Sequence, residues 1–529
     1  MGPTPELCDG KDNDCDGLID EGVLSSCGTC DQSCVQQCFG ADCGNPIDNC
    51  DTNCKGVKVD GNGYLVLDKG KKAIDLNYIW IANSKENTVS KLNTQSGAEI
   101  GRYKTCADPS RTAVDLEGNA WVGCRGGAAV ARIINEKKNC IDKNGNGKIE
   151  TSEDKNNDGK VIGAEVLPYG KDECLKFVVK PPGVKMARAV GVDKQNHGWI
   201  GDWHGKLLWR LRPSDGKVVG TYPIGCNPYG IVVDTKGIVW VSGRGCHAIV
   251  RLDPKTKKVT HHKANSKFNP YGINLDIYGN IWTGNCCGHH AAYRLDTKTM
   301  KFSYVAMKYR PRGLATSIDG YVYVAADQTH SVARINAKTM KLEGHISLGG
   351  GRFPIGMALD YDGMVWAVNQ QKATASKIDP KKMKVIGEYK VGKGPYTYSD
   401  MTGYTLHNFT APQGHYYAVF GMSEGGGTVA EDGATTTTWT ELSVDADVPA
   451  GAWIDLRYRS ADNVAALANA AWSKPQGPFP PMSMPVDLTK GGNKVVGTYL
   501  EAEVFLQASS GKQSPAVKSV SAKGKQSIK

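Results

Sequence analysis

A phrase that recurs seven times constrains the fold of this 529-residue chain more than any other feature. Its clearest copies are Asn227-Pro-Tyr-Gly-Ile-Val-Val-Asp, followed by Trp240, and Asn269-Pro-Tyr-Gly-Ile-Asn-Leu-Asp, followed by Trp282. A period of roughly 40–45 residues with several short strands per unit is typical of a β-propeller. We therefore predict an all-β chain with a seven-bladed β-propeller over residues 58–403. Apart from one interval of 78, the copies lie 41 to 43 residues apart, at Trp80, Trp121, Trp199, Trp240, Trp282, Tyr323 and Trp366.

The register of the repeat predicts four antiparallel strands in each blade. The innermost strand ends in Asp, the second carries the aromatic residue, the third carries Arg-Leu-Asp, and the fourth is short. The connection between the second and third strands then shares one face, here called the top face, with the connection to the next blade. The innermost strand of the first blade has two candidates, 64–68 and 395–400. A strand from the far end would close the ring without exposed edges.

The interval of 78 residues is explained by an insertion at 135–175, between the third and fourth strands of the second blade and so on the bottom face. Two stretches in it match the twelve-residue EF-hand loop, in which alternate oxygen-bearing side chains precede a glycine. The seventh position offers only its backbone carbonyl, and no helix fits between the two loops. The predicted calcium ligands are Asp142, Asn144, Asn146, Lys148, Glu150 and Glu153 in the first loop, and Asp154, Asn156, Asp158, Lys160 and Glu165 in the second.

The N-terminal residues 1–22 also carry carboxylates at alternate positions, here around Gly17. This stretch closely resembles the MopE-type metal-binding motif of secreted bacterial proteins. The family's name suggests copper, whereas hard oxygen ligands favour Ca²⁺. We expect a structural site there, and two or three Ca²⁺ ions per chain. The predicted ligands are Asp12, Asp14, Asp16 and either Asp20 or Glu21.

Seventeen cysteines indicate an oxidising compartment. Residues 23–57 form a Cys-rich segment with few large apolar residues, so we expect disulfides to replace a core there, although the spacing also permits zinc. Its seven cysteines leave one to pair elsewhere or stay free. Cys286 and Cys287 are adjacent, and either form a vicinal disulfide or find separate partners. The other predicted pairs are Cys8–Cys15, Cys106–Cys124, Cys140–Cys174 and Cys226–Cys246.

Beyond the repeats, residues 404–522 alternate apolar and polar positions between turns rich in Gly and Pro, which predicts a β-sandwich of jelly-roll or immunoglobulin-like type. A basic tail follows at 523–529. The net charge of +10 is modest and fits either a solvated surface or affinity for an anionic polymer. No nucleic-acid-binding motif is present, and no stretch is long and apolar enough to span a membrane. Because no apolar run precedes Cys8, we expect an export signal to have been removed.

The candidate catalytic and ligand-binding residues lie in the top-face connections. Histidine occupies the seventh position after the aromatic residue in three successive blades. Imidazoles at one register favour a metal or acid–base site, although duplication can also preserve a histidine that only caps a loop. A metal or an arginine would acidify the proton alpha to a carbonyl of an acidic substrate, and His or Tyr would remove it. The candidates are His204, His247, His289, His330 and Tyr271 for catalysis, and Arg125, Arg244, Arg310, Arg312 and Tyr229 for ligand binding.

The phrase Tyr-Gly-Ile-Val-Val-Asp, with Trp-Val-Ser and Ile-Val-Arg-Leu-Asp after it, resembles the repeats of the virginiamycin B lyase-like propellers, which are related to NHL-type families. The resemblance covers about residues 60–400 and implies seven blades. The family's namesake opens a cyclic peptide by metal-assisted elimination, with a Glu and a His two residues apart after one Trp strand. Asp202-Trp203-His204 resembles that arrangement, with Asp in place of Glu. No match for the remaining acidic ligand is evident.

Two functions are therefore expected. The first is a secreted or cell-surface, calcium-binding recognition or scaffold protein whose top face binds an extracellular ligand, either polysaccharide or peptide. The alternative is a metal-dependent lyase, similar to virginiamycin B lyase or to polysaccharide lyases, with a second divalent or transition metal held by the top-face histidines.

Overall fold

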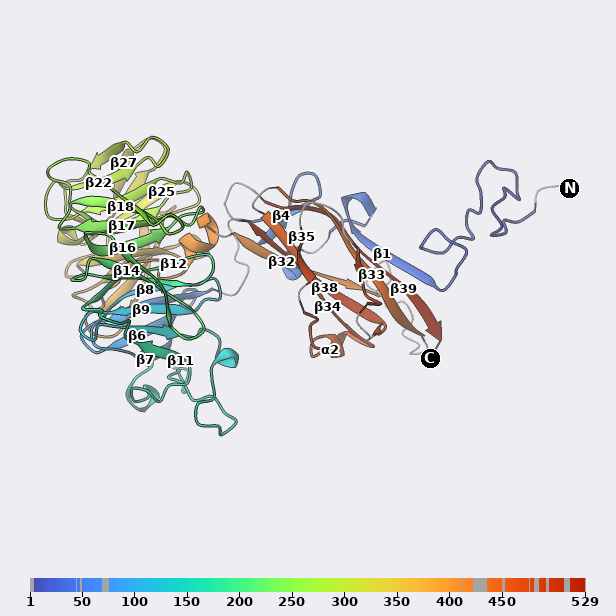
Figure 1. Ribbon diagram of the computed structural model, residues 1–529, viewed down its shortest axis with the longest axis horizontal. Coiled ribbons are helices and arrows are strands. Elements are labelled where there is room, and N and C mark those ends of the chain that lie inside the picture. The colour runs from blue at the N-terminus through green and yellow to red at the C-terminus, as the bar shows by residue number, and fades with distance from the viewer. Residues whose placement is uncertain are drawn as a thin grey trace. The chain divides into compact units, whose positions relative to one another are not determined.

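The computed structural model describes residues 4–43, 45–47, 50–68, 76–410, 412–421, 435–449, 452–474, 476–479, 485–490, 494–508 and 514–528. The chain divides into two compact units (Figure 1). One is Ile74–Pro412, and the other joins Met1–Ala73 to Gln413–Lys529. Both units are built from β-strands, which confirms the predicted fold class. Among the described residues, no helix is long and apolar enough to cross a membrane.

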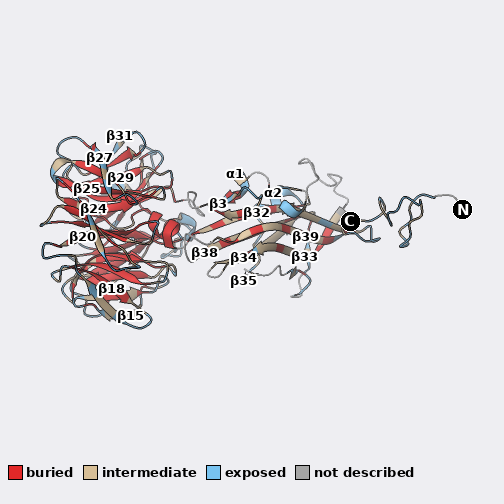
Figure 2. Cartoon of the chain, turned by 90° about the horizontal axis from the view of Figure 1, so that it is seen from above, coloured by how far each residue is buried: buried red, intermediate tan, exposed pale blue. Residues whose placement is uncertain are grey.

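The first unit is a propeller of seven antiparallel sheets, each formed by strands that follow one another along the chain. Their central strands are mostly buried, whereas the outermost strands are less buried, and β15 and β31 alternate between half-buried and exposed residues (Figure 2). The first three sheets are β5–β7 (Tyr78–Asn83, Thr88–Asn93, Glu99–Lys104), β8–β11 (Pro109–Val114, Ala120–Cys124, Ala129–Ile133, Leu175–Val179) and β12–β15 (Ala187–Val192, Gly198–Asp202, Leu207–Leu211, Val218–Pro223). The next two are β16–β19 (Asn227–Val233, Val239–Arg244, Ala248–Asp253, Lys258–His262) and β20–β23 (Pro270–Leu275, Ile281–Asn285, Ala291–Leu295, Phe302–Ala306). The last two are β24–β27 (Pro311–Thr316, Tyr321–Ala326, Ser331–Asn336, Lys341–Ser347) and β28–β31 (Pro354–Leu359, Val365–Asn369, Thr374–Asp379, Lys384–Lys390).

The ring is closed by residues 395–401, which supply the missing inner strand of the first blade. The Tyr396 N–H donates to the Ala82 carbonyl at 2.9 Å, and the Trp80 N–H donates to the Met401 carbonyl at 3.1 Å. Of the two sequence candidates, the late segment therefore lines the first blade. The other candidate contains β4 (Leu65–Leu67), which pairs with the last strand of the second unit.

A hydrogen bond within each of four blades explains why Asp and Trp recur six residues apart. The aspartate Oδ2 accepts the indole N–H of the tryptophan on the second strand, while Oδ1 accepts backbone N–H groups of the intervening turn. The four pairs are Asp193–Trp199, Asp234–Trp240, Asp276–Trp282 and Asp360–Trp366, at 2.8–2.9 Å. In the second blade, Asp115 pairs with Arg132 instead, and the buried indole N–H of Trp121 has no partner.

The segment that follows the closing strand packs into the core of the propeller. Residues Leu406–Thr410 form one π-helical turn in which every residue is buried. Tyr404 and Phe409 belong to the same apolar cluster as Leu359 and Tyr361. The propeller therefore extends to about residue 412, past the boundary expected at 403.

The second unit is a β-sandwich whose two sheets include N-terminal strands. One sheet has the order β3-β4-β39-β33-β36, with β1 on β39 and β37 on β33, and the other has the order β2-β32-β38-β34-β35. A single apolar cluster that includes Val57, Leu65, Trp439 and Val504 draws on both sheets. The strands are β1 (Cys34–Gly40), β2 (Cys54–Lys55), β3 (Val57–Val59), β4, β32 (Gln413–Phe420), β33 (Thr435–Asp447), β34 (Ala452–Ala461), β35 (Gln476–Phe479), β36 (Val486–Asp487), β37 (Val495–Val496), β38 (Tyr499–Ala508) and β39 (Ala516–Ile528).

This arrangement changes three expected boundaries. Residues 34–67, expected to divide between the Cys-rich segment and the propeller, contribute four strands to the sandwich. The sandwich resumes at Gln413 rather than 404. The expected basic tail continues β39 as far as Ile528, and Lys525 pairs with Asp31 at 2.9 Å; Lys529 lies outside the described residues.

Eight disulfides join sixteen of the cysteines. Cys8 pairs with Cys30, so the predicted Cys8–Cys15 pair is wrong, and Cys15 is free and exposed. The spacing of Cys8 and Cys15 permitted a bond, but spacing does not specify a partner. The odd cysteine of the 23–57 segment is thus Cys30, which pairs outside that segment. The other bonds are Cys27–Cys34, Cys38–Cys43, Cys50–Cys54, Cys106–Cys124, Cys140–Cys174, Cys226–Cys246 and the vicinal Cys286–Cys287.

Candidate functional site

A shared irregularity at the top end of the inner strands directs side chains toward the propeller axis. In six blades the pairing of the first two strands shifts register after the first or second residue of the inner strand, as between Pro228 and Gly230. A β-bulge of this kind re-aims the side chain that it contains. In four of these blades glycine follows the residue at the bulge, where the strands crowd together: a Cβ on Gly356 would meet the Thr397 carbonyl. The residues at the bulge include Arg188, Tyr229, Tyr271 and Arg312, and Tyr396 holds the same place in the closing strand.

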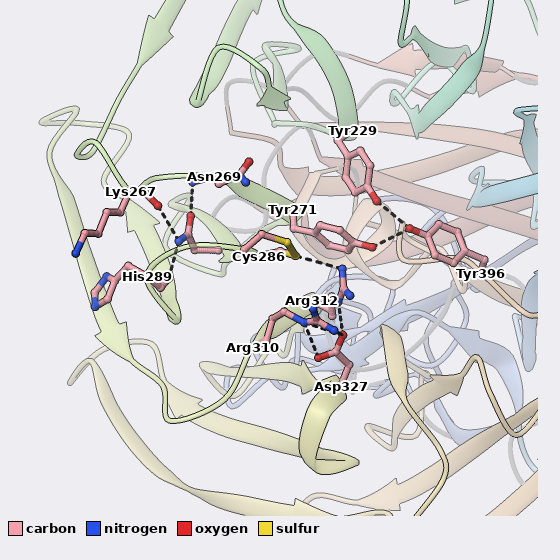
Figure 3. Close-up of a disulfide and its surroundings, with 12 residues drawn as sticks. Tyr229, Lys267, Asn269, Tyr271, Cys286, His289, Arg310, Arg312, Asp327 and Tyr396 are labelled. Carbon is pink, nitrogen blue, oxygen red and sulfur yellow. Dashed lines mark hydrogen bonds and ion pairs between the residues drawn. A yellow bond between two sulfur atoms is a disulfide. The ribbon is translucent and has the colours of Figure 1, made fainter.

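Three tyrosines from three of these inner strands meet at their hydroxyl groups. The Tyr396 Oη lies 2.8 Å from the Tyr229 Oη and 2.8 Å from the Tyr271 Oη. Figure 3 shows the three side chains pointing toward one another. Arg188 Nη2 donates to Tyr229 at 2.8 Å and to Tyr396 at 3.3 Å. The Tyr396 oxygen therefore has three potential donors around it.

A fully buried arginine lies beside the three tyrosines. Arg111 is 0 % exposed, and its guanidinium stacks 3.2 Å from the centre of the Tyr398 ring. Its Nη1 donates to the Ser110 carbonyl, while Nε and Nη2 have no hydrogen-bond partner. Burial and the charge of Arg188 lower the pKa of Arg111 to about 9, so the group remains cationic at neutral pH.

The ionisation of Tyr396 responds to these cations. Burial alone would raise the pKa of Tyr396. The charges of Arg111 and Arg188, with hydrogen bonds from Tyr229 and Tyr271, outweigh burial and lower this pKa to about 7. The pKa of Tyr271, which is fully buried, is raised well above its ordinary value because burial disfavours its charged form.

Further arginines surround this cluster, which we call the axial site. Arg244 lies 5.3 Å from the Tyr229 ring centre and 5.7 Å from that of Tyr271. Arg125 lies 4.8 Å from the Tyr396 ring centre and pairs with Asp108 at 2.5 Å. The axial site is defined by Arg111, Arg125, Arg188, Trp203, Tyr229, Arg244, Tyr271, Arg312, Tyr396 and Tyr398.

The vicinal disulfide borders the axial site. Cys286 is 0 % exposed and belongs to the same apolar cluster as Tyr229, Tyr271 and Tyr398. Arg312 Nη1 lies 3.2 Å from Cys286 Sγ, and its guanidinium is 4.9 Å from the Tyr271 ring centre. Arg310 and Arg312 both pair with the buried Asp327, as Figure 3 shows. Of the predicted ligand-binding residues, all but Arg310 thus belong to the axial site, and Arg310 reaches it through Asp327.

The histidines at the seventh position serve the connections between blades. His247 and His330 adopt left-handed backbone, with φ of 54° and 51°. The His247 Nδ1 lies 3.0 Å from the Phe268 carbonyl, and the His330 Nδ1 accepts the Phe353 N–H at 3.1 Å. Asn87, at the same register of the first blade, likewise accepts the Asp108 N–H at 2.8 Å. A hydrogen-bonding residue at this turn therefore fastens the backbone just before the next inner strand.

The remaining candidates of this set are also dispersed. The His289 Nδ1 bonds the Tyr293 hydroxyl at 3.0 Å, and His204 is exposed. Asp202, expected to act with His204, is buried and accepts the N–H groups of Lys185 and Met186. In the part of the chain that is described, none of the four histidines belongs to a group of three or more potential metal ligands.

The two loops of the insertion and the N-terminal motif share one hydrogen-bond pattern. In each, the aspartate at position 1 accepts the N–H groups of positions 5 and 6, and position 5 accepts the N–H of position 7. Asp154 shows this with Asp158 at 3.2 Å and Gly159 at 2.8 Å, and Asp142 shows it with Asn146 at 3.3 Å and Gly147 at 2.8 Å. Asp12 does the same with Asp16 at 3.2 Å and Gly17 at 2.9 Å.

A glutamate completes each loop by accepting the N–H groups of positions 2 and 9, but its origin differs. In the second loop it is Glu165, at position 12 as predicted. In the first loop it is Glu173, which lies outside the twelve residues and next to Cys174. The predicted Glu153 instead pairs with Lys137 at 2.6 Å. In the N-terminal motif it is Glu6, which precedes the loop.

The carboxylates of the N-terminal motif converge in two groups. Asp12, Asp14 and Asp16 bring ligand atoms within 4.8 Å of one another, and so do Glu6, Asp14 and Glu21. Asp20 points elsewhere, because its Oδ1 accepts the N–H groups of Asp9 and Gly10. Of the two alternatives left open by the sequence, Glu21 therefore lies with the other carboxylates.

No protein-family model and no curated protein matches this chain. Solved structures share its propeller at low identity. The streptogramin B lyase structure is 16% identical with a TM-score of 0.44, over 64% of this chain and 95% of that one. The virginiamycin B lyase from Staphylococcus aureus is 16% identical with a TM-score of 0.44, over 64% of this chain and 97% of that one. A functionally unknown protein from Desulfotomaculum acetoxidans is 12% identical with a TM-score of 0.45, over 61% of this chain and 99% of that one.

Proposed function

We propose that this chain is an extracellular recognition protein whose axial site binds an anionic ligand, and that calcium stabilises its insertion and its N-terminal motif. One observation carries the proposal: arginines gather around the three-tyrosine network with too few carboxylates to balance them. Arg111 and Arg244 form no ion pair among the described residues, and Arg188 bonds only phenol oxygens there. Unbalanced positive charge in a partly desolvated setting favours a negatively charged partner.

The ligand class follows from the side chains at the rim of the site. Arginine binds carboxylate and phosphate groups in a planar, two-pronged geometry. Trp203 packs against Tyr229, with ring centres 5.6 Å apart, and offers an aromatic surface beside these charges. Acidic polysaccharide or acidic peptide fits this combination, whereas a neutral polymer uses none of the charge.

The calcium proposal concerns residues that carry oxygen at the required positions. Asp142, Asn144, Asn146 and the Lys148 carbonyl would hold one ion, and Glu173 is better placed than Glu153 to complete that set. Asp154, Asn156, Asp158, the Lys160 carbonyl and Glu165 would hold a second. Asp12, Asp14 and Asp16, with Glu6 or Glu21, would hold a third. Oxygen donors of this kind suit Ca²⁺ rather than copper.

An extracellular setting is supported by the covalent structure. Eight disulfides, three of which close short loops within the 23–57 segment, fit a protein that matures in an oxidising compartment. The histidines do not favour the lyase alternative, because each of His247, His289 and His330 is engaged in its own local contact.

Binding of a defined polyanion to two matched variants tests the recognition proposal. Arg244→Met removes a cation of the axial site, and Arg251→Met removes an arginine that lies 5.9 Å from the Trp240 ring centre in the third strand of the same blade. We expect polygalacturonate or polyglutamate to bind the unmodified chain, with affinity that falls as salt rises. Arg244→Met should weaken binding at least about tenfold, which corresponds to about 1.4 kcal/mol. Equal binding of dextran, or equal losses in both variants, would overturn the proposal.

A further inference from the structure

The tyrosine network contains one more hydroxyl proton than its internal contacts can use. Tyr229, Tyr271 and Tyr396 bring three O–H groups, but only two O···O contacts join them. Tyr229 Oη also accepts from Arg188, and its own hydroxyl proton can be donated to Tyr396, because either oxygen of that pair can be the donor. Tyr271 Oη has Tyr396 as its hydrogen-bond partner among the described residues. If both neighbours donate to Tyr396, its own proton has no acceptor within the network.

The charge balance points to the same oxygen. An arginine retains its proton in proteins, and a buried charge needs a partner of opposite sign. Arg111 is fully buried and has no carboxylate partner, and the groups that most affect its charge are Arg188 and the same three tyrosines. Removing the surplus proton from Tyr396 would both satisfy the network and supply the missing negative charge.

We propose that Tyr396 is a tyrosinate in the resting protein and serves as the base of the axial site, accepting a proton from a carboxylate-bearing ligand. This inference rests on the proposed function for the identity of the ligand. In the step, an O–H bond forms at Tyr396 Oη and the ligand's C–H bond next to the carboxylate breaks. The electron pair stays on the ligand as an enolate, which the surrounding guanidinium groups stabilise.

Solvent contact, nearby cations and hydrogen-bond donors all favour this role of Tyr396. Its half-buried side chain retains contact with solvent, so a ligand can approach it. The lowered pKa of Tyr396 agrees with the geometry, because cations and hydrogen-bond donors stabilise the charged form of the phenol. The charged and titratable groups around it are Arg111, Arg125, Arg188, Tyr229, Tyr271, Arg312 and Tyr398.

The ionisation is measured on the full chain through the near-ultraviolet absorbance of phenolate. The chain contains 22 tyrosines, and we expect one of them, Tyr396, to titrate near pH 7. Tyr396→Phe should remove that single step. Tyr229→Phe and Tyr271→Phe each remove one donor and should move the step to higher pH. A titration without a step near neutrality, or a step that persists in Tyr396→Phe, would overturn the inference.

Reactivity toward a carboxylate-bearing probe tests whether the tyrosinate is accessible. In 4-(fluorosulfonyl)benzoate, a phenolate attacks sulfur, the O–S bond forms, the S–F bond breaks and fluoride leaves. We expect peptide mass spectrometry to find the adduct on Tyr396 at neutral pH, formed faster than with 4-(fluorosulfonyl)benzamide. Arg244→Met should remove that preference, and an unchanged melting temperature shows that the variant is folded.

The two proposals fail in different ways in these experiments. Equal reaction of both probes at Tyr396 would retain the tyrosinate and contradict the recognition of anions. Absence of the adduct, despite a titration step that belongs to Tyr396, would show that the phenolate only balances the charge of the buried arginines. That result would overturn its role as a base.

Discussion

The hydrogen bond between Asp276 and Trp282 offers a quantitative test of how each repeat is held together. Asp276 is 2 % exposed and Trp282 is fully buried, and the indole N–H donates to Oδ2 at 2.8 Å. Asp276 Oδ1 separately accepts the backbone N–H groups of Tyr278 and Asn280 at 2.9 Å each. Asp276→Asn keeps the shape and an oxygen for the turn, but it places an NH₂ group against the indole N–H.

The expected cost follows from leaving that buried donor without an acceptor, which is about 1–3 kcal/mol. We take about 2 kcal/mol. The propeller unit of about 340 residues should unfold with an entropy of about 0.7 kcal/mol/K, so its melting temperature should fall by about 3 °C. Differential scanning calorimetry of the full chain measures this as a shift of the propeller transition.

A double-mutant cycle identifies the cause of the shift. Trp282→Phe removes the donor itself, so Asp276→Asn should cost less than half as much when it is combined with Trp282→Phe. Asp296→Asn is the matched control, because Asp296 accepts the N–H groups of Lys298 and Thr299 in a turn of the same blade but bonds no indole. An equal cost of Asp276→Asn with and without Trp282→Phe, or an equal cost for Asp296→Asn, would refute the reasoning.

Three further outcomes are expected. EDTA should lower the melting temperature and expose residues 140–174 to protease. Glu173→Gln should weaken Ca²⁺ binding more than Glu153→Gln does. Calorimetric titration measures both variants, and equal Ca²⁺ affinities would contradict the role of Glu173. The double variant His247→Ala, His289→Ala should keep its metal content, and loss of a transition metal from it would restore the lyase alternative. The pKa of Tyr396 is lower in the folded chain than in the unfolded chain, so its deprotonation adds stability as pH rises from about 7 to about 10, and this gain is lost as pH falls through 7; Tyr396→Phe should flatten that rise, whereas an unchanged profile would contradict the low pKa.

The propeller was predictable because each repeat is held by interactions between residues that are close in the sequence. An aspartate and a tryptophan six residues apart form a bond within one hairpin, so the spacing fixes two strands and their turn. The choice of closing strand was not decidable from the chain, because 64–68 and 395–400 are both suitable strands. Only the three-dimensional packing shows that β4 pairs in the sandwich.

The residues of the candidate site were predictable where their place in the repeat determines their position in the blade. Tyr229, Tyr271 and Arg312 follow a proline at the start of an inner strand, and the same register contains Arg188 and Tyr396, which the sequence reasoning missed. Arg111 lies one position later, so only the structure reveals it. The histidines misled for a physical reason: the seventh position is a turn with left-handed backbone in several blades, and a side chain there reaches the adjacent backbone.

The loops show another limit of pattern reading. Position 12 of the EF-hand motif identifies Glu165 correctly as the acid that closes its loop, but it points to Glu153 where Glu173 holds that place. Glu6 likewise precedes the motif that it completes. A consensus motif assigns ligands by their position in the sequence, whereas these carboxylates lie outside the twelve-residue loops and reach them through the fold.

Because the propeller lies between β4 and β32 in the chain, the order of synthesis has a consequence for folding. β1 and β4 both pair with β39, the last of the described strands, and the propeller itself closes only with residues 395–401. β1 and the hairpin of β3 and β4 must therefore wait without β39 while more than 300 residues emerge. Unpaired strands in incomplete chains promote misassembly. The disulfides Cys27–Cys34, Cys38–Cys43 and Cys50–Cys54 span only 7, 5 and 4 residues, so they can form during that wait and keep the segment locally ordered until its partner strand arrives.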